Sequence, residues 1–117
     1  MKNYLAVFFG KPNAMKAWKA LPESERKDRE QAGMAAWHKW VADNNSVISE
    51  MGSPLGKTKR ADKHGMSDTH NELCAWTVVK ANSQEEATRL FLNHPHFAIF
   101  PGDHIEVMEC LPIPGAA

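Results

Sequence analysis

The residues of this chain that are best suited to chemistry are its histidines, beginning with His38. His38 follows Met34 by four residues and precedes Val41 by three, so it lies at the margin of an apolar helical stripe. An imidazole titrates near neutral pH, and partial burial tunes its pKa, which suits His38 to general acid–base catalysis. A histidine in such a position also borders a core and hydrogen-bonds a neighbouring backbone group in many proteins. Both interpretations stay open at this point.

A second histidine group is the sequence His94-Pro95-His96. Neutral imidazoles are good ligands for zinc, copper or nickel, so this pair is a candidate arm of a metal site together with His104 or His38. No cysteine or cluster of carboxylates accompanies the pair, however, and we therefore predict no bound metal. The alternative is that His94 stabilises the C-terminus of the preceding helix, where a cationic side chain is favoured.

A long polar segment between residues 52 and 70 contains Asp68 and four basic residues: Lys57, Lys59, Arg60 and Lys63. A loop of this length in a compact domain is usually functional or disordered. One interpretation is a lid on which Asp68 supplies a carboxylate to a ligand site and the basic residues hold an anionic substrate. The other is a solvated surface loop.

Three further residues are candidates for ligand binding. Ser53 and Pro54 begin a turn that can present backbone N–H groups to a ligand, since a glycine follows closely and allows close approach. Trp18, on a short first helix, is the tryptophan that best suits a pocket mouth. The other three tryptophans recur at helical and strand periods that are typical of core or interface residues.

An α+β arrangement is predicted to position these residues. Strands are predicted over residues 3–9, 46–51, 72–81 and 104–111, and helices over residues 14–21, 24–44 and 83–93. Ser83 and Glu86 form a capping box at the start of the last helix. This order is typical of a ferredoxin-like split β-α-β fold, with a four-stranded antiparallel sheet and both main helices on one face. We expect the strand order fourth, first, third, second, and a single domain over residues 1–117.

The first and third predicted strands are apolar on both faces, around Leu5, Val7, Trp76 and Val78. The two main helices cover only one face of the sheet, so the second apolar face needs a partner. A twofold dimer that packs sheet against sheet covers it. The sequence therefore predicts a homodimer through the sheet faces, a dimeric α+β barrel.

Composition excludes several classes of function. Fourteen basic residues balance fourteen acidic ones, which argues against nucleic-acid binding. No apolar run approaches the roughly 20 residues that span a bilayer, and residues 1–10 are typical of a strand rather than a signal peptide, so we expect no membrane partner and a cytoplasmic location. Cys74 and Cys110 match no metal or disulfide pattern and are predicted to be inert core thiols. Serine-nucleophile, phosphate-loop and dinucleotide motifs are missing, so no cofactor is expected.

The order and spacing of four segments resemble the YCII-related family, which includes the DGPF subgroup, of small dimeric α+β-barrel proteins. These segments are MKNYLAVFF, GMAAWHKWVADNNSVISEMGSPLG, NELCAWTVVKANSQEEATRLFLNHPHF and IEVMECLPIPG. The resemblance implies a ferredoxin-like fold, a homodimer joined through its sheets, and a pocket between sheet and helices. In that pocket a histidine on the long helix lies near an Asp-Pro that follows the second helix.

This resemblance also implies roles for individual residues. His38 matches the helical histidine, whereas the Asp-Pro site reads His94-Pro95 and the DGPF loop reads Gly65-Met66-Ser67-Asp68. His94 would then replace the aspartate as the catalytic partner of His38, and His96 would help to line the pocket.

Two functions follow from these observations. The first is a small-molecule-binding homodimer with cofactor-free acid–base catalysis through His38 and His94, with isomerisation, dehydration or hydrolytic dehalogenation as the reaction types. The alternative is a non-catalytic binding or accessory module in which the histidines are structural. Neither the substrate nor the reaction follows from the sequence.

Overall fold

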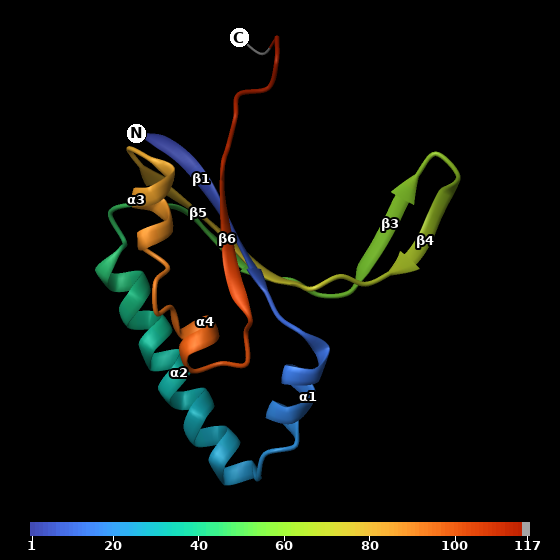
Figure 1. The fold of residues 1–117 in the computed structure, drawn as a ribbon, viewed down its shortest axis with the longest axis vertical. Helices are drawn as coiled ribbons and strands as arrows, with labels where there is room; N and C mark the ends of the chain where they lie inside the picture. The colour runs from blue at the N-terminus through green and yellow to red at the C-terminus, as the bar shows by residue number, and fades with distance from the viewer. Residues whose placement is uncertain (116–117) are drawn as a thin grey trace.

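A four-stranded antiparallel sheet forms the centre of the computed structural model, which describes residues 1–115 (Figure 1). Its strands are β1 (Lys2–Phe9), β2 (Ile48–Pro54), β5 (Leu73–Ala81) and β6 (His104–Glu109), in the order β2-β5-β1-β6. The helices are α1 (Pro12–Lys19), α2 (Glu23–Asp43), α3 (Gln84–Arg89) and α4 (Pro95–Ala98). The predicted α+β fold class and the predicted strand order are both confirmed.

The core lies between the sheet and the helices. Alternate residues of β1, namely Tyr4, Ala6 and Phe8, are buried on this side, because side chains along a strand alternate between its two faces. Val79 and Ala81 of β5 and Val107 of β6 extend this surface, and Ala87 and Phe91 cover it. Trp37 and Trp40 of α2 pack against the same cluster.

Helix α2 has two different halves. Its N-terminal half is charged and exposed, and pairs residues four apart, such as Glu23 with Lys27 and Glu25 with Arg29. Its C-terminal half carries the two tryptophans. Gly33 lies between the halves, where a Cβ atom would come within 2.5 Å of the Phe100 ring. Glycine at this position therefore lets α2 approach the segment after α4 closely.

The second face of the sheet carries no helix of the described residues. Leu5, Val7, Trp76 and Val78 are half-buried on it, and Met108 is exposed. His104 stacks on Phe9 here, with ring centroids 4.7 Å apart, and its two nitrogens lie 2.7 Å from carboxylate oxygens of Asp103 and Glu106. These hydrogen bonds raise the pKa of His104. The face is therefore apolar at its centre and charged along β6.

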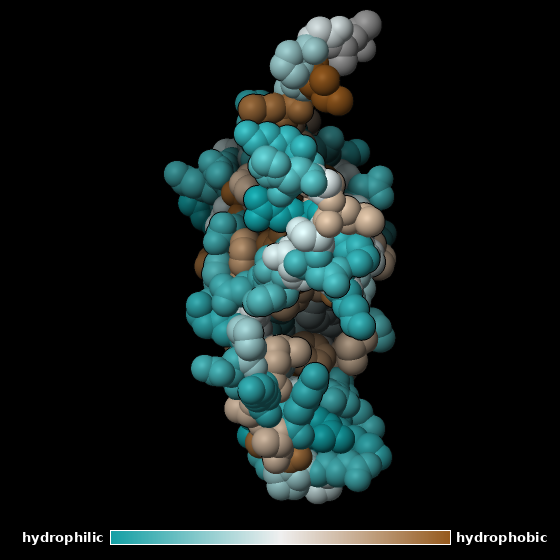
Figure 2. All heavy atoms as spheres, turned by 90° about the vertical axis from the view of Figure 1, so that its right-hand side faces the viewer, coloured by the Kyte–Doolittle hydropathy of each residue, from teal (hydrophilic) through white to brown (hydrophobic). Residues whose placement is uncertain are grey.

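The long polar segment between residues 52 and 70 contains two strands where a loop was predicted. It forms a hairpin of β3 (Thr58–Asp62) and β4 (Gly65–Thr69) that projects from the body of the molecule (Figure 1). Asp62 accepts a hydrogen bond from the His64 N–H, and Gly65 adopts a φ of +123°, which together close the turn. Figure 2, viewed from this side, shows mostly hydrophilic residues with smaller hydrophobic areas between them. The loop prediction was wrong because local turn chemistry is enough to pair these two polar strands.

Other boundaries also differ from the prediction. Helix α1 begins at Pro12, without a side-chain cap from Asn13. Helix α3 ends at Arg89, and the chain then turns through Asn93, whose φ is +57°. The Ser83 cap is confirmed, since its hydroxyl accepts a hydrogen bond from the Glu86 N–H at 3.1 Å. Both cysteines are free, but Cys110 is exposed rather than part of the core.

No helix among the described residues is both long enough and apolar enough to cross a membrane.

Candidate functional site

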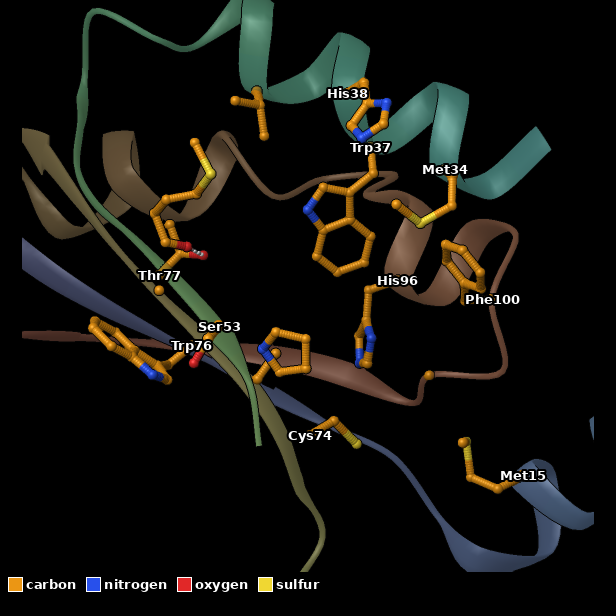
Figure 3. A pocket seen from close by; sticks show the side chains of 16 residues that line it. Met15, Met34, Trp37, His38, Ser53, Cys74, Trp76, Thr77, His96 and Phe100 are labelled. Atoms are coloured by element: carbon orange, nitrogen blue, oxygen red, sulfur yellow. Dashed lines mark hydrogen bonds between the residues drawn. The ribbon is translucent and has the colours of Figure 1, made fainter. Parts of the chain in front are cut away.

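A cavity of about 570 Å³ lies between α2 and the β2–β5 side of the sheet (Figure 3). Its walls are largely apolar and include three methionines and two tryptophans. The polar residues among them are few, and two are histidines. The lining residues are Met15, Met34, Trp37, His38, Val41, Met51, Gly52, Ser53, Pro54, Cys74, Ala75, Trp76, Thr77, His96, Phe100 and Gly102.

His96 and Thr77 are the most deeply buried polar residues of the cavity wall, each with 6% of its surface exposed. The Nε2 atom of His96 lies 2.8 Å from the Phe9 carbonyl oxygen. Because a carbonyl oxygen only accepts, Nε2 must carry the proton. The same oxygen accepts a second hydrogen bond from the Asp103 N–H at 2.8 Å, at the irregular end of β1 where its register with β5 shifts. The main chain therefore fixes both the orientation and the tautomer of His96.

The other ring nitrogen of His96, Nδ1, is available to a ligand. Among the described residues the one hydrogen bond of the ring within 3.5 Å is made by Nε2, and Nδ1 is not a fully buried atom without a partner. Burial lowers the pKa of His96, and this exceeds the opposing effect of the Phe9 and His104 backbone carbonyls. Neutral His96 thus presents an unprotonated Nδ1 as a hydrogen-bond and proton acceptor.

His38 occupies a different part of the same cavity. It lies on α2 next to Trp37, and its residue is exposed to solvent although its side chain lines the cavity. The sequence pattern places His38 at the margin of the apolar stripe of the helix, and in the structure His38 is exposed at the edge of the helix face that lines the cavity. A histidine at the rim can exchange protons with solvent, whereas His96 deeper in the wall cannot do so as readily.

His94 is buried outside the cavity wall, with 1% of its surface exposed. Aromatic rings surround it, with the centroids of Trp37, Trp40 and Phe8 at 4.6, 4.8 and 5.2 Å. Burial, followed by the neighbouring His96, lowers the pKa of His94 to about 4. The structure therefore brings His96, rather than His94, into the cavity that His38 lines.

The local role of His94 also differs from the predicted one. It does not cap the preceding helix; its Nδ1 accepts a hydrogen bond from the His96 N–H at 3.0 Å and so caps the N-terminus of α4. Its Nε2 is the one buried side-chain nitrogen or oxygen without a partner in the part of the chain that is described. Helix α4 begins at Pro95, which suits the first position of a helix because it lacks an N–H.

The remaining candidate residues divide between the cavity and the surface. Ser53 and Pro54 line the cavity from its exposed edge, at the end of β2. Trp18 is not a lining residue but packs behind Phe100, with ring centroids 5.8 Å apart. Asp68 lies on the projecting hairpin, where it pairs with Lys59. Neither Trp18 nor Asp68 is brought to the cavity wall.

Sequence reasoning missed two contributors to the site. Cys74 lines the cavity, and burial, followed by the charge of Glu72, raises the pKa of its thiol. Gly102 also lines the cavity. It lies so close to the His96 ring that a Cβ atom at this position would come within 2.3 Å of it. A glycine shortly after a His-containing turn is the only sequence signal for that close approach. Among the described residues, no three of His, Cys, Asp and Glu come together as a candidate metal site.

Comparisons with known proteins support the fold. No family model and no curated protein sequence matches the chain. A solved structure that is similar to it is 5-chloro-2-hydroxyhydroquinone dehydrochlorinase (TftG) from Burkholderia phenoliruptrix AC1100, in complex with 2,5-dihydroxybenzoquinone. The TM-score is 0.51 at 17% sequence identity, over 90% of this chain and 89% of the other. The α+β fold is thus shared, and the resemblance to YCII-related proteins stays a prediction from the sequence.

Proposed function

We propose that this chain binds a small apolar molecule in the cavity between α2 and the sheet, and that it carries out cofactor-free proton transfer there with His96 and His38. The observation that carries the proposal is that two histidines, His96 buried and His38 exposed, line the same largely apolar cavity. Concave apolar sites with a few polar groups are typical of ligand-binding sites.

The two histidines suit different steps of acid–base chemistry. His96 is neutral with an open Nδ1, so it accepts a proton from a bound molecule. His38 at the rim returns protons to the product or to solvent. Isomerisation and dehydration each require one proton to be removed and one to be delivered.

Loss of hydrogen chloride from a carbon skeleton needs the same base. The C–H bond electrons form the new double bond, chloride leaves with the C–Cl electrons, and the base takes the proton. The TftG enzyme is named for a dehydrochlorination. We include this reaction type because a neutral imidazole in an apolar cavity supplies the base that it requires.

The proposal includes a homodimer through the open sheet face. Leu5, Val7 and Val78 form a half-buried apolar surface there, over which residues 1–115 place no helix. A twofold partner placed against this face would bury the apolar surface.

The alternative function is a binding module without catalysis. It is favoured by the position of His94, which has a structural role as the cap of α4. In that case the protein binds ligands in the cavity but does not convert them, and replacement of His38 or His96 affects binding alone.

Calorimetry with β-naphthol as an apolar aromatic probe tests ligand binding. Val41→Phe fills the cavity from α2 and should abolish binding, whereas Lys39→Phe adds the same side chain to the exposed side of that helix and should bind like the unmodified protein. Absence of naphthol binding to the unmodified protein, or equal binding to both variants, would contradict the proposal.

A further inference from the structure

We infer that the ligand is a hydroxylated aromatic molecule whose uncharged hydroxyl donates a hydrogen bond to His96 Nδ1. This inference rests on the proposed function, since it uses the same cavity. It adds the chemical class of the ligand and the atom that selects it.

The first step is the tautomer of His96. Its Nε2–H donates to the Phe9 carbonyl oxygen, so Nδ1 cannot carry a proton while the ring is neutral. Gly102 lies against the Cε1 and Nε2 atoms of the ring and, because it has no Cβ, leaves the ring in this orientation. A ligand therefore meets an acceptor, not a donor, at His96.

The second step concerns the other polar groups inside the cavity. The Thr77 hydroxyl donates its hydrogen to the Met51 carbonyl oxygen at 3.0 Å. The Cys74 thiol lies 3.6 Å from the Glu72 carbonyl oxygen, to which it donates. Both hydrogens are already used within the protein. Neither group offers its hydrogen to a ligand, so a ligand hydroxyl that donates meets acceptors there as well as at His96 Nδ1. The indole N–H groups of Trp37 and Trp76 also line the cavity, and a hydroxyl can accept from such a donor as well as donate.

The third step concerns charge. Within residues 1–115, no lysine, arginine, aspartate or glutamate lines the cavity. A carboxylate or phosphate would lose its hydration there without a cationic partner, and an ammonium group would lose it without an anionic one. An uncharged ligand is therefore favoured over an ionic one.

The fourth step concerns shape. Trp37 and Phe100, whose rings meet edge to face with centroids 6.0 Å apart, supply aromatic surfaces, and Met15, Met34 and Met51 are among the other apolar lining residues. Methionine side chains adapt to irregular apolar shapes and make favourable contacts with rings. These walls suit a flat aromatic body. Together the four steps specify an aromatic ring that bears a hydroxyl group.

Calorimetry with β-naphthol and its methyl ether tests this inference, because the two probes share an aromatic body and differ in the hydroxyl hydrogen. The ether should bind about tenfold more weakly, since it leaves a buried acceptor without a partner. His96→Phe keeps a ring of similar shape but removes both nitrogens, and with them the Nδ1 acceptor, so the two probes should bind it equally. Lys39→Ala, on the exposed side of α2, should keep the full preference.

The outcomes separate the inference from the function on which it rests. If neither probe binds the unmodified protein, the proposed function fails. If both bind equally well, the cavity binds aromatic molecules but the hydroxyl class is wrong. If the preference for naphthol persists in His96→Phe, another group recognises the hydroxyl and the assignment to His96 is overturned. The comparison of the two probes on the unmodified protein decides the question even if the variant does not fold.

Discussion

His94 and His96 are linked by a hydrogen bond in which the His96 backbone N–H donates to His94 Nδ1 at 3.0 Å. This bond caps α4, the short helix that carries the cavity histidine. His94 therefore acts on the site through the backbone of His96 and is a positioning residue. The histidine that lines the cavity is His96 itself, and it is the one that we propose as the proton acceptor.

Replacement of His94 separates its capping role from any role of its imidazole in chemistry. An asparagine side chain provides a good cap, whereas alanine provides none. We expect His94→Ala to lower the free energy of unfolding by about 2–4 kcal/mol, and His94→Asn by about 1 kcal/mol less than that. Urea denaturation gives both values. Naphthol binding at neutral pH should survive in His94→Asn, and its complete loss there would mean that the imidazole contacts the ligand.

The stability of the protein should depend on pH through His94. Its pKa is about 4 in the folded state and about 6.5 in the unfolded chain, so only the unfolded chain binds this proton between those values. Titration of His94 therefore leaves the free energy of unfolding unchanged above about pH 6.5 and lowers it as the pH drops from about 6.5 to 4. The loss is on the order of 3 kcal/mol by pH 4.

Other groups titrate in the same range, so the measurement is a difference. His104, whose pKa is raised, favours the folded state as the pH falls and opposes the effect of His94. Urea denaturation of the unmodified protein and of His94→Asn between pH 7 and pH 4 isolates the contribution of His94. Parallel curves for the two proteins would show that His94 is not buried in its neutral form.

Gly102 should be needed for the orientation of His96. A Cβ atom at this position would lie 2.3 Å from Cε1 and 2.4 Å from Nε2 of the ring. Gly102→Ala should therefore displace the ring from the Phe9 carbonyl, lower the free energy of unfolding by about 1–3 kcal/mol, and remove the preference for naphthol over its ether. Gly56→Ala is the matched control, because nothing lies within 4 Å of a Cβ atom there. Similar effects of the two substitutions would contradict this account of Gly102.

The proposed dimer makes a prediction about the open sheet face. Val7 lies at its centre, so Val7→Asp would place a charge in the dimer interface and should yield a monomer. Gln31→Asp introduces the same side chain on the exposed surface of α2 and should leave the dimer intact. Sedimentation velocity at micromolar concentration distinguishes the two states. A monomeric unmodified protein under these conditions would overturn the proposed dimer.

The sequence was informative about the fold because its signals are local and periodic. The apolar strand around Tyr4 and Phe8, the capping box at Ser83 and the tryptophans of α2 each indicated an element that the structure contains. The hairpin at residues 58–69 was missed because its strands are polar and bury almost nothing. Its order comes from turn geometry and from the pair of Lys59 with Asp68.

The candidate site was less accessible from the sequence. The position of His38 followed from helical spacing, which places a residue on a known face. The exchange of roles between His94 and His96 depends instead on the backbone of a short turn, which directs one ring into the core and the next toward the Phe9 carbonyl. No spacing rule gives those directions. The roles of Gly102 and Cys74 likewise depend on contacts between segments that are distant in the sequence.

Nitrogen-15 NMR of the histidine rings at neutral pH, with and without saturating β-naphthol, tests the central claim most directly. We predict that His96 is neutral, with a proton on Nε2 and none on Nδ1, and that naphthol shifts the Nδ1 resonance while it leaves that of Nε2 nearly unchanged. A proton on Nδ1 in the free protein, or an Nδ1 resonance that does not respond to bound naphthol, would contradict the assignment of His96 as the acceptor in the cavity.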